Sequence, residues 1–364
     1  MEERQHESLE CVRMYMLNRG FDALILRTRA NFCWITDGHH NHIETSSPLG
    51  VSDFLILRDE LVLVTTKVEA PRIVEEELRD LPCRIIAVDW TDSPKAALCA
   101  ALSAYSHIAS DTAFDTAQVV ESDLRRLRKR LTPHQVDQYM ETCQLAGSAM
   151  AAAAHRLQRG MTEFEAAAVL TQEALIRGLN ASVVLVSSDE RIQQYRHPLP
   201  TMKPILRMVM LVMCAEKYGL YANLTRFVAF DSVDATFSDR HAKCSYIDAA
   251  MGRATRPGRT VGSVVERAMV AYREVGYPDD WQYLHLGGPT GYATREWFAT
   301  ARDTDIIAPS ECYTWNPTLP GIKSEDTLLV REEENCYLTE TENWPMMEVR
   351  IDGDIVYRPA ILQK

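Results

Sequence analysis

The hydrophobic pattern of the first 110 residues switches repeatedly between the period of a helix and that of a strand. Helical patterns cover residues 2–19, 68–79 and 94–105, and extended apolar runs cover 22–27, 53–58, 61–66, 84–88 and 107–110. Such alternation is typical of an α/β domain, in which helices pack on a sheet. We therefore expect residues 1–125 to form one α/β domain.

A charged segment, Asp123–Arg130, follows this domain and indicates a linker. Thr132 and Pro133 then have the residue types of a helix start, and Thr162 with Glu165 has the spacing of a capping box. Further along, extended runs are expected at 182–187, 208–214 and 220–230, and helices at 238–253 and 261–275. A length of 364 residues favours two domains. The second is expected to be an α+β domain over residues 126–364.

Composition narrows the classes of partner. The net charge of -12 argues against general binding to nucleic-acid phosphates. The N-terminal twenty residues lack the apolar core of a signal peptide, and no run of about 20 apolar residues could span a membrane. Nine scattered cysteines without a Cys-x-x-Cys pair are typical of a reducing compartment. We expect a cytoplasmic protein that binds neither nucleic acid nor membrane.

The common catalytic motifs are absent, including Gly-x-Ser-x-Gly, the P-loop and His-Glu-x-x-His. A glycine-rich stretch at 287–291 contains Pro289, which lacks the backbone N–H that a phosphate-binding loop needs. Four other segments of the second part carry clustered polar residues: 195–200 (YRHPLP), 219–226 (GLYANLTR), 285–296 (HLGGPTGYATRE) and 315–327, which contains WNP and KSEDT.

In this order and spacing, the four segments resemble the active-site segments of the methionine aminopeptidase, prolidase and creatinase superfamily over roughly residues 125–345. The first part resembles the N-terminal domain of the prolidase and creatinase branch. The resemblance implies an α/β N-terminal creatinase-like domain and an α+β pita-bread catalytic domain. It also implies hydrolase activity on a small-molecule substrate, in the manner of the aminopeptidase family, and a homodimer.

Metallopeptidases of this superfamily hold two metal ions with two Asp, one His and two Glu. Carried over by position, these ligands fall on Val212, Asn223, His285, Asn316 and Glu325. Only His285 and Glu325 remain good ligands, and three negative charges are lost that hard divalent ions would require. We therefore expect no dinuclear metal site and no cofactor.

Creatinase is the branch that works without metal, and its catalytic histidine corresponds by position to His197. A histidine can transfer protons near neutral pH without help from a metal. We expect His197, His285 and Glu325 to form the catalytic set. The guanidinium-binding carboxylates of creatinase would fall on Thr225 and Asn316, which are uncharged. The substrate is therefore expected to be neutral or anionic.

Other matching positions are expected to bind substrate: Tyr221, Asn223, Arg226, Tyr292, Arg295 and Asn316. Tyr292 stands where the family has its second active-site histidine and can still donate a hydrogen bond. The two arginines could hold an anionic group in a bidentate manner.

A histidine-rich loop in the first part adds three expected substrate contacts, His39, His40 and His42. It follows residues 31–36, which resemble the Asn-x-x-Tyr-Leu-Thr stretch of the family. In creatinase-like dimers, the loop after that stretch reaches over the active site of the partner.

The favoured function is a metal-independent, creatinase-like hydrolase that cleaves a C–N or related bond. Its substrate would be a small amide, a peptide-like molecule or an amino-acid derivative. One alternative is a metallo-aminopeptidase or prolidase with altered ligands, and another is a non-catalytic pita-bread binding module. Purely structural roles are the alternative for some of these residues. His197 could satisfy the hydrogen bonds of a turn, and Arg226 could form a structural ion pair. The histidine loop could be a solvated surface loop.

Overall fold

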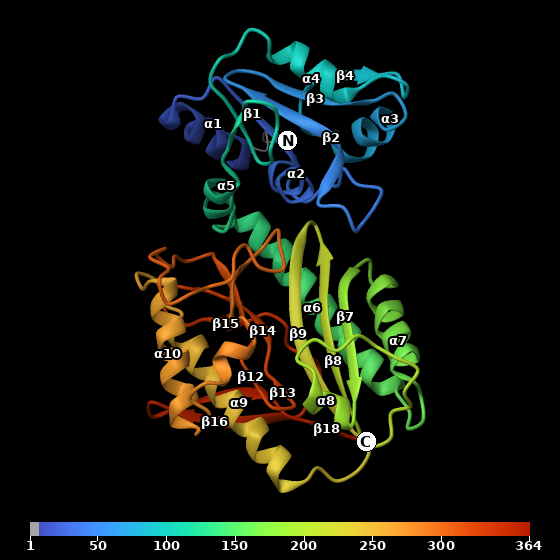
Figure 1. Ribbon diagram of the computed structural model, residues 1–364, viewed down its shortest axis with the longest axis vertical. Coiled ribbons are helices and arrows are strands. Elements are labelled where there is room, and N and C mark those ends of the chain that lie inside the picture. Colours follow the sequence, from blue (N-terminus) through green and yellow to red (C-terminus); the bar gives the residue numbers. More distant parts are fainter. Residues whose placement is uncertain (1–6) are drawn as a thin grey trace. The chain divides into compact units, whose positions relative to one another are not determined.

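A computed structural model describes residues 7–364 of the protein (Figure 1). The chain divides between Thr132 and Pro133 into two compact units, which are described separately below. The boundary expected after residue 125 falls inside helix α5 (Glu121–Arg128). Residues 2–6 of the first expected helix lie outside the described part of the chain.

The first unit contains a six-stranded sheet in the order β4-β3-β2-β1-β5-β6. Its strands are β1 (Ala23–Thr28), β2 (Leu49–Leu57), β3 (Leu61–Thr66), β4 (Arg84–Val88), β5 (Ile108–Ser110) and β6 (Gln118–Val119). Helices α1 (Glu7–Arg19), α2 (Arg29–Ile35), α3 (Ala70–Arg72) and α4 (Pro94–Leu102) surround it. Apolar side chains of β1, β2, β3 and α4 form a common core, because alternate strand residues face the same side.

Two expectations for this unit were wrong. The segment expected as a linker forms helix α5, because Leu124 and Arg128, one turn apart, are both buried against the unit. Arg128 Nη1 donates to Asn31 Oδ1 at 2.6 Å, so its charge is held inside the domain. The helix expected over residues 68–79 is instead short α3 followed by a π-helical turn, Ile73–Glu77.

The second unit contains two four-stranded sheets, ordered β18-β9-β8-β7 and β10-β11-β14-β15. The strands of the first sheet are β7 (Asn180–Ser188), β8 (Met208–Lys217), β9 (Leu220–Ala229) and β18 (Leu362–Gln363). Those of the second are β10 (Gly287–Thr290), β11 (Cys312–Trp315), β14 (Asp326–Leu329) and β15 (Cys336–Tyr337). Two hairpins complete the unit: β12 (Thr318–Leu319) with β13 (Ile322–Lys323), and β16 (Met346–Ile351) with β17 (Asp354–Pro359).

Helices pack on these sheets as Figure 1 shows. Helices α6 (Pro133–Arg156) and α7 (Glu163–Leu175) cover the β7–β9 sheet, and α9 (Ala235–Ala254) with α10 (Val261–Glu274) packs beside the second sheet. Short α8 (Glu190–Gln194) and the 3-10 turn Asp280–Tyr283 lie in connections. The capping box predicted at Thr162 and Glu165 is confirmed, because each side chain bonds the backbone N–H of the other residue.

The sequence predicts neither disulfide bonds nor membrane-spanning helices. All nine cysteines are free thiols, as their scattered pattern predicts. Within residues 7–364, none of the helices combines the length and the apolar character that a membrane crossing requires.

Candidate active site

The second sheet gathers three candidate residues at one of its edges. His285 lies just before β10, Asn316 just after β11, and Glu325 just before β14. These three strands pair in antiparallel fashion, so the start of β10, the end of β11 and the start of β14 lie at the same edge. Residues far apart in the sequence are thereby brought together.

Strand β9 adds residues from the neighbouring sheet. The backbone N–H of Thr225 donates to the carbonyl oxygen of Glu325 at 3.1 Å, which joins β9 to the start of β14. Asn223 and Thr225 face the same side, because strand side chains alternate. Arg226 therefore faces the opposite side of β9.

Glu325 lies at the centre of a buried ion cluster. Its Oε1 accepts from Arg295 Nη2 at 2.8 Å, and its Oε2 lies 2.9 Å from Lys323 Nζ. Thr225 Oγ1 donates to Oε2 at 2.7 Å. Burial alone would raise the pKa of Glu325, but Lys323, Arg295 and the Thr225 hydroxyl outweigh it and lower the pKa to about 2. Glu325 is therefore a carboxylate whose charge is already compensated by two side-chain cations.

The two candidate histidines lie next to each other beside this cluster. The ring centroids of His197 and His285 are 6.1 Å apart, and His285 stacks on Phe298 at 4.0 Å. Burial, followed by the positive charges of Arg295 and Lys323, lowers the pKa of His285 to about 4. Partial burial, followed by the positive charge of Lys323, also lowers the pKa of His197, although the residue as a whole is exposed. Both rings are neutral at pH 7, and either can accept a proton.

Asn223 is held by neutral groups only. Its Nδ2 donates to the carbonyl oxygen of Tyr221 at 3.1 Å and to the hydroxyls of Thr290 and Thr314, each at 3.2 Å. Thr314 in turn hydrogen-bonds to Thr327 at 3.2 Å. Because a carbonyl oxygen can only accept, the amide NH2 must face Tyr221, which fixes the orientation of the Asn223 side chain.

Val212 and Asn316 are the other two uncharged residues at positions where the resemblance implies metal ligands. Val212 pairs with Thr225 across β8 and β9 and belongs to the hydrophobic core of the unit. Asn316 is 2% exposed. Within residues 7–364, Asn223 Oδ1, Asn316 Oδ1 and His285 Nδ1 are buried without a hydrogen-bond partner. In the same range, no group of three His, Cys, Asp or Glu side chains is placed to hold a metal ion.

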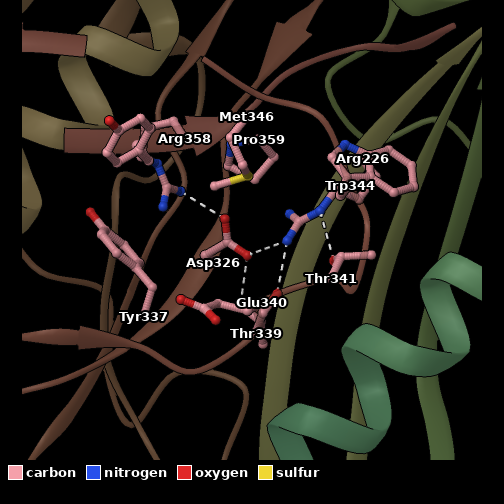
Figure 2. A pocket seen from close by; sticks show the side chains of 11 residues that line it. Arg226, Asp326, Tyr337, Thr339, Glu340, Thr341, Trp344, Met346, Arg358 and Pro359 are labelled. Atoms are coloured by element: carbon pink, nitrogen blue, oxygen red, sulfur yellow. Dashed lines mark hydrogen bonds and ion pairs between the residues drawn. The ribbon is translucent and has the colours of Figure 1, made fainter. Parts of the chain in front are cut away.

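Two expected substrate-binding arginines are already engaged. Arg226 donates to Asp326, to Thr341 and to the carbonyl oxygens of Thr225 and Thr339 (Figure 2). Its side chain therefore faces away from the side of β9 on which Thr225 contacts Glu325. Arg295 lies in the site, but its Nη1 bonds the carbonyl oxygen of Thr294 and its Nη2 bonds Glu325. Bidentate binding of a substrate anion would require either arginine to leave these partners.

The two expected tyrosines differ in exposure. Tyr292 is 2% exposed and follows β10. Tyr221 is half-buried at the start of β9, and its carbonyl oxygen also accepts from Tyr139 Oη at 2.7 Å. Its backbone N–H donates to the carbonyl oxygen of Gly291, which ties β9 to the turn beside Tyr292.

The histidine loop is anchored within its own unit. His39 Nδ1 lies 3.3 Å from Glu77 Oε2, His40 Nδ1 lies 3.4 Å from Cys33 Sγ, and His42 Nε2 lies 3.4 Å from Arg29 Nη2. Burial, followed by the positive charge of Arg29, lowers the pKa of His42 to about 4. The expected contact of this loop with a substrate in a dimer stays a prediction.

Sequence reasoning missed Lys323, the threonine hydroxyls around Asn223, and Phe298. Lys323 is 6% exposed, and Glu325 is its described partner. The spacing of Lys323 and Glu325 could have indicated their pairing, because side chains two residues apart in an extended segment lie on the same face. The threonine cluster could not have been found from spacing alone, because Thr290, Thr314 and Thr327 come from three strands of one sheet and surround Asn223, which lies on β9.

Comparison with known proteins places this chain in a family. The model of metallopeptidase family M24 matches residues 137–340, which is 204 of the 364 residues. The chain therefore belongs to metallopeptidase family M24. An Xaa-Pro dipeptidase of Pyrococcus furiosus is 24% identical over 234 residues; the match covers 61% of this chain and 66% of that protein, just under two thirds.

Solved structures show the same fold. The prolidase of Pyrococcus horikoshii OT3 matches with a TM-score of 0.79 at 17% identity, covering 92% of this chain and 99% of that one. The Xaa-Pro dipeptidase of Bacillus anthracis matches with a TM-score of 0.78 at 17% identity, covering 98% and 99%. The predicted fold, an α/β creatinase-like domain followed by an α+β pita-bread domain, is confirmed, and so is the resemblance to the creatinase and prolidase superfamily.

Proposed function

We propose that the protein is a metal-independent hydrolase of small amides or peptide-like, amino-acid-derived molecules. The observation that carries the proposal is the compensation of Glu325 by Lys323 and Arg295. A carboxylate that binds two divalent ions should not also have two side-chain cations within hydrogen-bond distance, since like charges repel. Together with Asn223 and Val212 at former ligand positions, this donor set does not fit a dinuclear metal site.

His197 is the proposed general base. Its neutral ring accepts a proton from water as the water oxygen attacks the carbonyl carbon of the scissile amide. The same proton then passes to the departing amine nitrogen as the C–N bond breaks, so the ring returns to its neutral state. His285, stacked on Phe298, orients the water or the substrate beside His197.

Lys323 is the proposed electrophilic group. The described part of the chain gives its ammonium group one hydrogen-bond partner, Glu325, although an ammonium has three N–H donors. A spare donor in a buried site can stabilise the negative charge that develops on the carbonyl oxygen. Counting Lys323, Arg295 and Glu325, with neutral histidines, the site carries one net positive charge. This charge favours neutral or anionic substrates.

Xaa-Pro dipeptides are the first substrates to test, because the similar Pyrococcus furiosus protein is an Xaa-Pro dipeptidase. Replacing His197 with Ala should lower turnover by roughly a hundredfold or more, the usual effect of losing positioned proton transfer. The matched control is His134→Ala, which removes an exposed histidine of α6. Equal turnover in both variants would exclude His197 as the base.

A non-catalytic binding module is the second candidate. The N-terminal domain of FACT complex subunit SPT16 from Cicer arietinum shares the fold, with a TM-score of 0.68 at 12% identity. The loss of carboxylates at the former ligand positions suits a binding module as well as a metal-free enzyme. Under this alternative, no amide or dipeptide is hydrolysed, and His197→Ala changes binding but no reaction rate.

A further inference from the structure

A cavity lies on the side of β9 that Arg226 faces, opposite to the side on which Thr225 contacts Glu325. It has a volume of about 300 Å³, enough for a small organic molecule. The side chains that line it come from β9, β14, the 337–346 segment and β17 (Figure 2). None of the residues given above as candidate catalytic groups lines it, so it is distinct from the candidate active site.

The floor of the cavity is a buried chain of ion pairs. Asp326 Oδ1 accepts from Arg226 Nη2 at 2.8 Å, and Asp326 Oδ2 accepts from Arg358 Nη2 at 2.8 Å (Figure 2). Arg358 Nη2 also bonds Asp248. Two arginines and two aspartates leave this network without net charge. A lone anion or a lone cation therefore finds no excess of opposite charge at the floor.

The floor has hydrogen-bond donors to spare, but few acceptors. All described hydrogen bonds of Arg358 use Nη2; within residues 7–364 its Nε is buried without a hydrogen-bond partner, and no described hydrogen bond uses its Nη1. Asp326 Oδ1 is already shared by Arg226 and Thr339. An occupant of this cavity should therefore present an oxygen acceptor to the floor, and a carboxylate is the group that a guanidinium binds best.

The rim supplies one negative charge, that of Glu340, and an apolar wall. Glu340 is exposed, and its carboxylate has no described ion pair or hydrogen bond within residues 7–364. Around it stand Tyr357, which is 55% exposed, Met346, which is 48% exposed, Pro359, and the more deeply placed Trp344. Large apolar side chains left open at the mouth of a polar cavity mark a site for an apolar group.

We propose that this cavity binds a small zwitterion with an apolar side chain, of which a free apolar α-amino acid is the simplest example. Its carboxylate would bind the spare donors of Arg358, its ammonium group would bind Glu340, and its side chain would pack on Tyr357 and Met346. One molecule thus satisfies spare donors at the floor, a spare carboxylate at the rim, and the apolar wall.

The cavity is joined to the candidate active site through two strands. Arg226 follows Thr225 on β9, and Asp326, the first residue of β14, follows Glu325, so consecutive residues face the two sites. An occupant that draws Arg358 or Asp326 toward the cavity acts on the same strands that position Glu325. Binding is therefore expected to alter the kinetics of the hydrolase, a coupling that rests on the proposed function.

Isothermal titration calorimetry of the full-length protein tests the site directly. L-leucine and L-methionine should bind, while N-acetyl-L-leucinamide, which lacks both charges, should bind at least about tenfold more weakly, because two charge-assisted contacts are lost. Glu340→Gln should weaken the binding of L-leucine about tenfold, and Glu342→Gln, the exposed neighbour that does not line the cavity, should leave it unchanged. Tyr357→Ser should weaken L-leucine more than glycine.

The outcomes separate this site from the active site. In His197→Ala, L-leucine should bind as in the wild type, whether or not the protein proves to be a hydrolase. Loss of binding in that variant would place the amino acid in the active site and overturn the proposal. Binding that is equal in Glu340→Gln and the wild type, or no binding of either amino acid at millimolar concentration, would overturn it as well.

Discussion

Lys323 Nζ lies 2.9 Å from Glu325 Oε2, while Arg295 Nη2 lies 2.8 Å from Oε1 of the same carboxylate. Each oxygen of Glu325 therefore faces a side-chain cation. In the metallopeptidases that the sequence resembles, a glutamate at this position binds metal. Here the side chains of Lys323 and Arg295 bring two positive charges to the Glu325 carboxylate.

The Glu325 cluster should show strong energetic coupling. Glu325→Gln leaves two buried cations without a counter-charge and should lower the free energy of unfolding by about 3–5 kcal/mol. The double variant Glu325→Gln/Lys323→Met should recover part of this loss, because one unpaired cation is removed. Urea unfolding of both single variants, the double variant and the wild type measures the coupling. Additive losses would contradict the ion cluster.

Replacing the Asn223 amide with a carboxylate is expected to destabilise the protein. In Asn223→Asp, a carboxylate oxygen would replace the NH2 that donates to the carbonyl oxygen of Tyr221 at 3.1 Å. We expect the free energy of unfolding to fall by about 2–4 kcal/mol, the effect of an unpaired buried polar or charged group. Asn343→Asp, at an exposed position, is the control and should change it little. A stabilised Asn223→Asp that gained tight metal binding would show that the site accepts a metal ligand here.

The metal content of the purified protein follows from the donor set. With Val212, Asn223 and Asn316 at former ligand positions, we expect fewer than about one tightly bound divalent ion per chain. Elemental analysis after dialysis, with a chelator-treated sample as control, measures this number. Two ions per chain, retained through dialysis, would contradict the assignment.

The pH dependence of kcat/KM should report the ionisation of His197. A base must be neutral, and burial with the nearby Lys323 lowers its pKa below the usual value. Activity should therefore rise with pH through a limb that lies below about 6.5 and stay level above it. Lys323→Met removes a positive charge, so protonated His197 is less disfavoured and the limb should move to higher pH. A limb above 7 in the wild type would disagree with this account.

Acid should also lower the free energy of unfolding, because the pKa values of His285 and Glu325 are lower in the folded protein than in the unfolded chain. His285 has a folded pKa of about 4, below its unfolded value near 6.5. Its contribution to stability is therefore complete above about 6.5 and is lost as the pH falls toward 4. Glu325, with a folded pKa of about 2, loses its contribution at still lower pH. Unfolding curves that show equal stability at pH 7 and pH 5 would contradict the burial of His285.

Local patterns predicted most of the fold. The capping box at Thr162 and the extended runs at β1, β3 and β4 follow from residue periods and caps, which act over a few residues. Helix α5 escaped prediction because its burial depends on partners such as Asn31, 97 residues away from Arg128. His197, His285 and Glu325 were found through an ordered set of segments, and the structure places them beside one another.

The roles of the charged residues could not be predicted from spacing alone. Arg226 and Arg295 look alike in the sequence, but Arg226 faces Asp326 on the far side of β9 and Arg295 faces Glu325. Which side a strand residue faces depends on register, and which cation pairs with which carboxylate depends on strands that meet only in the folded chain.

The central claim, hydrolysis without a metal ion, is tested most directly by measuring turnover of an Xaa-Pro dipeptide or another accepted amide before and after exhaustive chelation. The account predicts unchanged turnover in the chelated wild type. Turnover in chelated His197→Ala should fall by roughly a hundredfold or more relative to the chelated wild type. Turnover that disappears on chelation and returns when a divalent transition metal is added would contradict the claim.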